Sequence, residues 1–345
     1  MDAEDPIGAR KLDHVRINLS EDVASGTQNG FERYRLRHRA LPEIDLEAVS
    51  TAVWVFGRQL RAPLLISSMT GGAAGLGPLN LLLAEAAQRW RIAIGVGSQR
   101  ASIESSAVAE SFRVRDVAPD CLLLANLGAV QLNYGYGAEQ CRRAVDGIRA
   151  DALILHLNPL QEAVQPEGNT RFKGLLDRIA EVVAALDVPV VVKEVGWGIG
   201  AEDARRLVEV GVAAIDVAGA GGTSWTEVER HRALDARGQA VAGAFRAWGT
   251  PTAESLVAVK AVAQQALVFA SGGIADGIDA AKALALGAAL VGVAGPMLRA
   301  ADAGEGALDD VLHVLVHTLR VAMFAAGAAT LADLAAPGTI ARVAP

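Results

Sequence analysis

Eight short apolar runs recur along the chain from residue 64 onward, and segments with helical spacing separate them. Short buried strands that alternate with helices pair in parallel through right-handed crossovers. Eight such units close most simply into a (β/α)8 TIM barrel, and this α/β fold is the one that the sequence predicts. The predicted strands span residues 64–67, 92–96, 121–125, 152–155, 190–192, 214–217, 267–270 and 289–293.

An open, doubly wound sheet is the structural alternative. It requires a G-x-G-x-x-G turn after the first strand, but residues 71–77 read G-G-A-A-G-L-G, which does not match. A barrel also predicts that polar residues gather at the carboxyl ends of its strands. Polar residues and glycines do follow the predicted strands, whereas the strand beginnings show no such enrichment. The pattern therefore favours the barrel.

Two segments lie outside the regular alternation. Residues 1–60 have poor periodicity, and we expect an N-terminal extension that packs on the barrel of residues 61–345. The connection at residues 221–249, after the sixth strand, is much longer than a normal barrel loop, and connections of that length are usually functional lids. Helical spacing at residues 308–326 predicts a helix that closes the C-terminal end of the chain.

Charge and cysteine content limit the partners of the chain. Its 39 acidic and 32 basic residues give a net charge of −7, so it has no global positive field that would attract nucleic acid or an anionic membrane. The longest apolar run, residues 283–298, is interrupted by glycine and proline and is too short to insert into a membrane. Two cysteines and no secretion signal predict a cytoplasmic protein.

A cluster of polar residues follows the fourth predicted strand. It contains His156, Asn158, Gln161 and Glu162, and Pro159 ends the strand because proline cannot donate to a sheet ladder. The cluster offers hydrogen-bond donors, acceptors and one carboxylate, and Glu162 suits a hard cation such as Mg²⁺. A polar loop that caps the next helix explains the same residues equally well.

Glycine turns follow the seventh and eighth predicted strands, at residues 271–274 and 294–295. Barrels of this class frequently bind phosphate there, through backbone N–H groups at a helix N-terminus. Glycine pairs also serve as helix caps and turns, so the signal is only moderately specific. Thr70, Ser98 and Asn126 follow the first three strands and are polar groups of the kind that satisfy a flavin ring, which favours a phosphate-bearing flavin.

Lys193 ends the fifth predicted strand, where a buried ammonium without a counter-charge would be costly. Beside the N1/O2 edge of a reduced flavin it would stabilise the anion. A salt bridge to Glu194 is the structural alternative.

Together these motifs carry a family resemblance. The chain resembles type 2 isopentenyl-diphosphate isomerase, the FMN-dependent family, in seven motifs that run in order from Arg10 to Gly295. Each motif alone is weak, whereas seven in register are highly specific. They are Arg10-Lys11-x-x-His14, residues 67–72 (SSMTGG), residues 97–100 (GSQR), His156-Leu157-Asn158-x-x-Gln161-Glu162, residues 165–168 (QPEG), residues 192–196 (VKEVG) and residues 221–225 (GGTSW).

The resemblance implies an isomerase that interconverts isopentenyl and dimethylallyl diphosphates in isoprenoid biosynthesis, with FMN, Mg²⁺ and NADPH to reduce the flavin. We also expect a homo-oligomer. Gln161, His156 and Lys193 would be catalytic, and Glu162 would hold Mg²⁺. Residues implied to bind FMN are Ser68, Met69, Thr70, Ser98, Asn126, Lys193, Thr223, Gly272, Gly273, Ile274, Ala294 and Gly295. Those implied to bind the diphosphate substrate are Arg10, Lys11, His14, Ser98, Gln99, Arg100, His156, Asn158 and Gln161.

The chain departs from the family pattern at one position: it has Ala275-Asp276 after the Gly-Gly-Ile turn, where family members often carry a basic residue. This puts a side-chain contact to the FMN phosphate in question, although backbone donors remain. Gln161 does not titrate near neutral pH, so we expect the reduced flavin to exchange the proton and Gln161 to orient or relay it. For Arg10 and Lys11, a solvated basic surface is the alternative.

Three other functions compete with this interpretation. An FMN-dependent 2-hydroxy acid oxidoreductase would need a histidine base near the mouth, yet none follows strands six or seven. A dehydrogenase of the inosine-monophosphate type would need a cysteine nucleophile after strand six, whereas the two cysteines are Cys121 and Cys141. A non-catalytic flavin-binding or scaffolding barrel would leave Gln161 and Glu162 unexplained.

Overall fold

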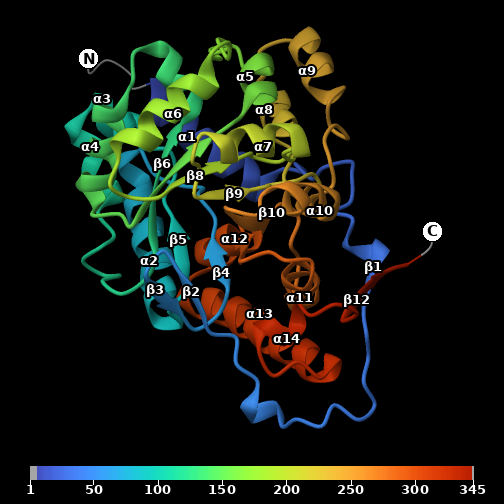
Figure 1. Ribbon diagram of the computed structural model, residues 1–345. Helices are drawn as coiled ribbons and strands as arrows, with labels where there is room; N and C mark the ends of the chain where they lie inside the picture. The colour runs from blue at the N-terminus through green and yellow to red at the C-terminus, as the bar shows by residue number, and fades with distance from the viewer. Residues whose placement is uncertain (1–5, 344–345) are drawn as a thin grey trace.

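A closed barrel of eight parallel strands forms the centre of the computed structural model, which describes residues 6–343 (Figure 1). Successive strands are neighbours around the barrel, and β11 closes it by pairing with β4, with Val291 opposite Leu64. The predicted (β/α)8 fold is therefore confirmed. The barrel strands are β4 (Leu64–Ile66), β5 (Ala93–Gly95), β6 (Leu123–Gly128), β7 (Ala152–His156), β8 (Val190–Lys193), β9 (Ala214–Asp216), β10 (Leu267–Ser271) and β11 (Leu290–Val293).

The strand bounds agree with the prediction to within one residue, with the exception of β6. This strand begins two residues later and ends three residues later than predicted, because its ladder with β7 continues through Asn126 to Gly128, opposite His156. The polarity of Asn126 predicts the end of the strand, although this residue continues the pairing with β7. The helices around the barrel are α2 (Gly77–Trp90), α4 (Ala138–Ile148), α6 (Leu175–Ala185), α7 (Ala201–Glu209), α10 (Thr252–Val262), α11 (Gly277–Ala285), α12 (Gly295–Ala303) and α13 (Glu305–Ala326).

Apolar residues of the strands divide between two cores, because successive side chains of a strand point to opposite faces. Leu64 and Ile66 belong to the larger core between strands and helices, whereas Leu65 belongs to a smaller core inside the barrel. The inner core also contains Leu124, Ile154, Val191, Phe269 and Leu290. A short hairpin, β2 (Val53–Val55) and β3 (Arg58–Leu60), packs against this inner core and covers one end of the barrel.

The N-terminal residues contribute a helix and an edge strand. The helix α1 (Pro6–Ser20) packs against α8 (Trp225–Arg232) and α12, and Ile17 is buried there beside Val228. The strand β1 (Tyr34–Leu36) pairs antiparallel with β12 (Ile340–Arg342), so segments from both ends of the chain lie side by side (Figure 1).

The long connection after the sixth strand is present, and it carries two helices rather than an irregular loop. These are α8 (Trp225–Arg232) and α9 (Ala236–Gly243), which lie with α5 (Pro159–Val164) at one end of the molecule (Figure 1). The predicted C-terminal helix is confirmed as α13. No helix within residues 6–343 has the length and apolarity needed to cross a membrane.

A buried ion-pair network closes the barrel end opposite the strand carboxyl termini. Asp151, which precedes β7, accepts hydrogen bonds from Arg115 at 2.7 Å and from Arg58 at 2.7 Å. It also accepts from the backbone N–H of Leu123 at 2.9 Å, where β6 begins. Arg115 is 7% exposed and has no second carboxylate partner among the described residues. Asp151 therefore neutralises a buried guanidinium and fixes the start of two neighbouring strands.

We predict that Asp151→Ala lowers the free energy of unfolding by about 3–5 kcal/mol, because it leaves a buried charge without a partner. Asp116→Ala is the matched control, since Asp116 pairs with Arg149 on the exposed surface and the loss there should be at most about 1 kcal/mol. Denaturant unfolding followed by circular dichroism measures both. Equal losses for the two variants would contradict the assigned role of Asp151.

Candidate active site

Strand alternation places a layer of polar side chains at the carboxyl-terminal mouth of the barrel. In six strands, the last apolar residue of the barrel interior is followed two positions later by a polar residue that points to the same side. The polar residues are Ser67, Asn126, His156, Lys193, Asp216 and Ser271, which follow Leu65, Leu124, Ile154, Val191, Ala214 and Phe269. The sequence therefore builds an apolar floor and a polar rim with one repeating pattern.

A cleft of about 440 Å³ opens at this rim. Ten of the twelve residues implied to bind FMN line it: Ser68, Met69, Thr70, Lys193, Thr223, Gly272, Gly273, Ile274, Ala294 and Gly295. The other two, Ser98 and Asn126, do not line the cleft. The backbone carbonyl of Ser98 accepts from Lys11, and the side chain of Asn126 bonds His156 and the carbonyl of Val96.

The cleft has features that fit a flavin mononucleotide. The hydroxyls of Ser67 and Ser68 are buried and have no hydrogen-bond partner within the described residues, so they are free to bond a ring edge. Gly272 and Gly273 have φ values of 103° and 70°, and an ideal Cβ on Gly222 would lie 2.6 Å from the nitrogen of Gly273. Only glycine permits this close packing, which leaves backbone N–H groups available to a phosphate.

Lys193 is part of a buried ion pair at the rim. Its Nζ lies 3.2 Å from Asp216 Oδ2 and donates to Ser271 Oγ at 3.0 Å, while Ser271 Oγ donates to Asp216 Oδ1 at 2.8 Å. The alternative prediction, a salt bridge from Lys193 to Glu194, is wrong. The Glu194 carboxylate instead accepts hydrogen bonds from the three backbone N–H groups of residues 195–197. Burial raises the pKa of Glu194 to about 7, against those hydrogen bonds. Lys193 consequently has a counter-charge without any ligand.

His156 is held as a neutral imidazole. Asn126 uses its amide nitrogen to donate to the carbonyl of Val96, so its Oδ1 accepts from His156 Nδ1 at 2.9 Å. Burial, reinforced by Lys11, Lys193 and Arg10, lowers the pKa of His156 to about 3. The side chain is therefore uncharged at physiological pH in the protein without ligands, which disfavours an imidazolium at this position.

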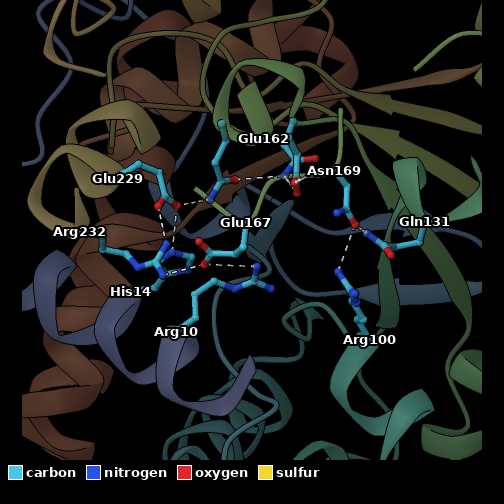
Figure 2. Close-up of polar contacts among 11 residues, drawn as sticks. Arg10, His14, Arg100, Gln131, Glu162, Glu167, Asn169, Glu229 and Arg232 are labelled. Carbon is cyan, nitrogen blue, oxygen red and sulfur yellow. Dashed lines mark hydrogen bonds and ion pairs between the residues drawn. The ribbon is translucent and has the colours of Figure 1, made fainter. Parts of the chain in front are cut away.

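His14 and Arg232 converge on one buried carboxylate, that of Glu229 (Figure 2), and Gln161 bonds the same group. Gln161 Nε2 and His14 Nε2 each donate to Glu229 Oε1 at 3.0 Å, and Arg232 donates to Oε2 at 2.6 Å. Burial opposes ionisation of Glu229, but its partners outweigh it and lower the pKa of the carboxyl. Burial lowers the pKa of His14, although Glu229 pulls in the opposite direction. Glu229 is therefore an ionised carboxylate that accepts hydrogen bonds from Gln161, His14 and Arg232.

Glu162 lies next to Gln161 on the short helix α5. Asn158 donates to Glu162 Oε1 at 2.9 Å and to Gln161 Oε1 at 3.2 Å. The backbone N–H of Asn169 donates to the second oxygen of Glu162, and Figure 2 shows these two residues side by side. Within residues 6–343, no group of three or more His, Cys, Asp or Glu side chains is placed to hold a metal ion. A cation bound at Glu162 would take most of its ligands from a substrate or water.

Arg10 and Lys11 have few hydrogen-bond acceptors and no close carboxylate of their own among the described residues. Lys11 donates to the carbonyl of Ser98 at 3.1 Å, and burial together with the neighbouring Arg10 lowers the pKa of Lys11 to about 7. Burial also lowers the pKa of Arg10, whose Nε has no hydrogen-bond partner among the described residues. Its nearest carboxylate, Glu167, lies 3.9 Å away and is shared with Arg232 (Figure 2). Partly desolvated cations of this kind are suited to an incoming anion.

Arg100 reaches the same region from α3 (Arg100–Glu104), where it donates to Asn169 at 3.3 Å (Figure 2). Gln99, its neighbour, has its side chain bonded away from this region. Its side chain is 2% exposed and bonds the N–H of Asn126 and the carbonyl of Ala144, toward the outer helices. These bonds position the turn between β5 and α3, and a substrate contact of Gln99 stays a prediction.

Sequence reasoning missed two residues of the site. Asp216 lies inside a predicted buried strand, and a charged residue there signals either a buried ion pair or a strand end. Its position two residues after an interior alanine could have identified it. Glu229 lies in the long connection after β9, and no local pattern marks it as more than one of several charges on a helix. Only the docking of α8 beside α1 and α5 reveals its role.

Comparisons with known proteins agree with this geometry. Residues 157–341 match the family model of FMN-dependent dehydrogenases. The chain is similar to an isopentenyl-diphosphate delta-isomerase from Synechocystis, with 56% identity over 327 residues that cover 94% of each chain. A second, from Stutzerimonas stutzeri, is 53% identical over 328 residues, which cover 94% of this chain and 95% of the relative. The chain belongs to the FMN-dependent, type 2 isopentenyl-diphosphate delta-isomerase family. The resemblance found in the sequence motifs is confirmed.

Solved structures show the same barrel at lower identity. A mandelate oxidase variant with a C4a-hydroxy-FMN adduct has a TM-score of 0.65 at 24% identity, covering 95% of this chain and 97% of the other. A flavocytochrome b2 variant with sulfite bound has a TM-score of 0.69 at 19% identity, covering 95% and 82%. These likenesses concern the isomerase family's fold and not its chemistry.

We predict that anion binding at Lys11 depends on pH. Because its pKa is about 7, the ammonium is charged below that pH and loses its proton above it. The dissociation constant for inorganic pyrophosphate should therefore rise by up to about fivefold between pH 7 and pH 8, as the protonated fraction of Lys11 falls. Lys11→Arg keeps the charge at both pH values and should remove this contribution. Isothermal titration calorimetry of both proteins with pyrophosphate at pH 7 and pH 8 measures these dissociation constants. Parallel pH profiles would show that Lys11 does not contact the anion.

Proposed function

We propose that the chain interconverts isopentenyl diphosphate and dimethylallyl diphosphate, with FMN in the 440 Å³ cleft and the diphosphate on the neighbouring cations. The observation that carries the proposal is the pair Arg10 and Lys11. Both are buried enough to have lowered pKa values, and neither has a close carboxylate of its own among the described residues. A flavin cleft that adjoins such cations suits an anionic substrate. The names of the relatives support the choice of an isoprenoid diphosphate.

Each part of the site has a task in this reaction, in which one carbon gains a proton and another loses one. Arg10, Lys11 and Arg100 would neutralise the diphosphate, and Glu162 would hold Mg²⁺ against its oxygens. Gln161 is fixed by Glu229 and Asn158, so its amide can orient the isoprenoid without titrating. Reduced FMN, when bound, would supply the acid–base chemistry, and NADPH would keep it reduced.

The electrostatic setting suits a reaction with cationic character at carbon. The carboxylate of Glu229 lies behind Gln161, and His156 remains neutral, so no imidazolium charge is added near the isoprenoid. The helix α8 covers this region, and Glu229 is 1% exposed, which is consistent with a lid that keeps water from the reacting carbons.

A 2-hydroxy acid oxidoreductase is less compatible with the site. The histidine among the described residues that line the cleft is His14, which comes from α1 and donates to Glu229. The segments after β9 and β10 supply glycines and small residues to the cleft where such an enzyme would place its base.

We predict that the purified chain, incubated anaerobically with isopentenyl diphosphate, FMN, Mg²⁺ and NADPH, forms dimethylallyl diphosphate. Chromatography of the dephosphorylated products measures this. Turnover should be lost with 5-deazaFMN, whose C5 lacks the proton chemistry of the nitrogen. Normal turnover with that analogue would remove the proposed acid–base role of the flavin.

We also predict that Glu162→Gln raises the Mg²⁺ concentration for half-maximal turnover by roughly 10- to 100-fold, because a carboxylate ligand becomes a neutral amide. The FMN dissociation constant should not change, since Glu162 does not line the cleft. Glu181→Gln, on the exposed face of α6, is the control for loss of one negative charge. An unchanged Mg²⁺ requirement would place the metal elsewhere.

A further inference from the structure

The phosphate end of the cleft lacks the basic side chain that the family often places after the Gly-Gly-Ile turn. Asp276 occupies that region, and its carboxylate caps α11 by accepting from the N–H groups of Ile278 at 2.8 Å and Asp279 at 2.9 Å. The Asp276 carboxylate thus serves as the N-terminal cap of α11. A dianionic phosphate bound at Gly273 and Gly295 would find backbone dipoles there, but no cation from this turn.

Arg299 supplies a cation from a different element. It lies on α12, four residues after Gly295, and lines the cleft together with Gly273 and Ala275. Helical side chains lean toward the N-terminus, and this one runs back over the first turn of its helix. An ideal Cβ on Gly295 would lie 3.2 Å from Arg299 Nη1 and 3.8 Å from its Cζ. The guanidinium therefore rests against the glycine turn where phosphate is expected.

The described residues supply no negative charge that pairs with the exposed Arg299 guanidinium at this helix end. The N-terminus of a helix carries partial positive charge, so a cation there is repelled by the helix dipole. The first turn of α12 has no acidic residue, and Arg299 has no ion pair or hydrogen bond among the described residues. Two carboxylates line the same cleft, but Asp22 pairs with Arg246 at 2.7 Å and Glu21 lies 3.9 Å from His231.

We infer that Arg299 binds the phosphate of FMN and replaces the basic residue missing at positions 275–276. The inference rests on the proposed function, since it takes FMN as the occupant of the cleft. The guanidinium would donate charge-assisted hydrogen bonds to phosphate oxygens, opposite the N–H groups of the glycine turns. It would then select phosphorylated flavin over riboflavin and leave the contacts of the ring unchanged.

The test compares FMN with riboflavin on the same protein. Apoprotein of the wild type, Arg299→Gln and Arg299→Lys is titrated with each flavin, and quenching of flavin fluorescence gives the dissociation constants. We expect Arg299→Gln to weaken FMN binding about 10- to 100-fold, as for loss of a charged hydrogen-bond donor. Riboflavin affinity should stay the same, and Arg299→Lys should recover part of the loss. The salt dependence of FMN binding should become shallower in Arg299→Gln.

Arg205→Gln is the matched control, because Arg205 is exposed on α7, has no ion pair or hydrogen bond among the described residues and does not line the cleft. Unchanged riboflavin affinity in Arg299→Gln also shows that its cleft is folded. If wild type and Arg299→Gln bind FMN equally, or if Arg299→Gln loses affinity for both flavins alike, the role of Arg299 is wrong and the proposed function stands. If the wild type binds neither flavin, both are wrong.

Discussion

The alternation of side chains along parallel strands is the constraint on which this site depends. Each barrel strand must bury an apolar residue at its interior position, and the next residue on that side, two positions later, reaches the mouth. The inner core ends at residues such as Leu124 and Ile154, and Asn126 and His156 follow directly above them. A shift of one residue in any strand would turn its polar group into the outer core. Packing of the floor therefore fixes the geometry of the rim.

The second requirement is the helix α1, which is remote in sequence from the barrel strands. It docks on α8 and α12 through Ile17 and brings Arg10, Lys11 and His14 to the mouth. Desolvating these cations opposes docking, as the lowered pKa of Lys11 shows. Apolar burial at Ile17 and the bond from His14 to Glu229 offset that cost. An anionic ligand would offset the remaining desolvation cost of Arg10 and Lys11. Binding of the ligand and docking of α1 should therefore stabilise each other.

Much of the fold was predictable, because eight apolar runs of the right length leave few architectures open. The wrong end of β6 shows the limit of that reasoning, since polarity at Asn126 was taken as the end of pairing when it only marked the end of the apolar floor. The order of motifs along the chain indicated most of the residues that line the cleft. The hydrogen-bond and ion-pair partners of those residues were harder to predict from the sequence. The link from Lys193 to Asp216 depends on strand register, and the link from Gln161 to Glu229 depends on how two helices dock.

On the proposed function, the charges of the site match the charges of its ligands. A diphosphate and a flavin phosphate are anionic in every state of the reaction, and two of the cations expected to meet them, Lys11 and Arg299, have no carboxylate partner among the described residues. The flavin ring is different, because its charge changes with reduction. Lys193, at the ring, has its own counter-ion in Asp216 at 3.2 Å. A buried lysine that has a counter-ion can stay charged beside a neutral ring at low cost. Without a counter-ion, the lysine would lose its proton or weaken the binding of the neutral ring. Of Lys11, Arg299 and Lys193, only Lys193 is paired within residues 6–343, and it is the one whose ligand is not always negatively charged. Arg10 and Arg100 differ, since each also contacts a carboxylate, Glu167 at 3.9 Å and Glu104 at 2.9 Å.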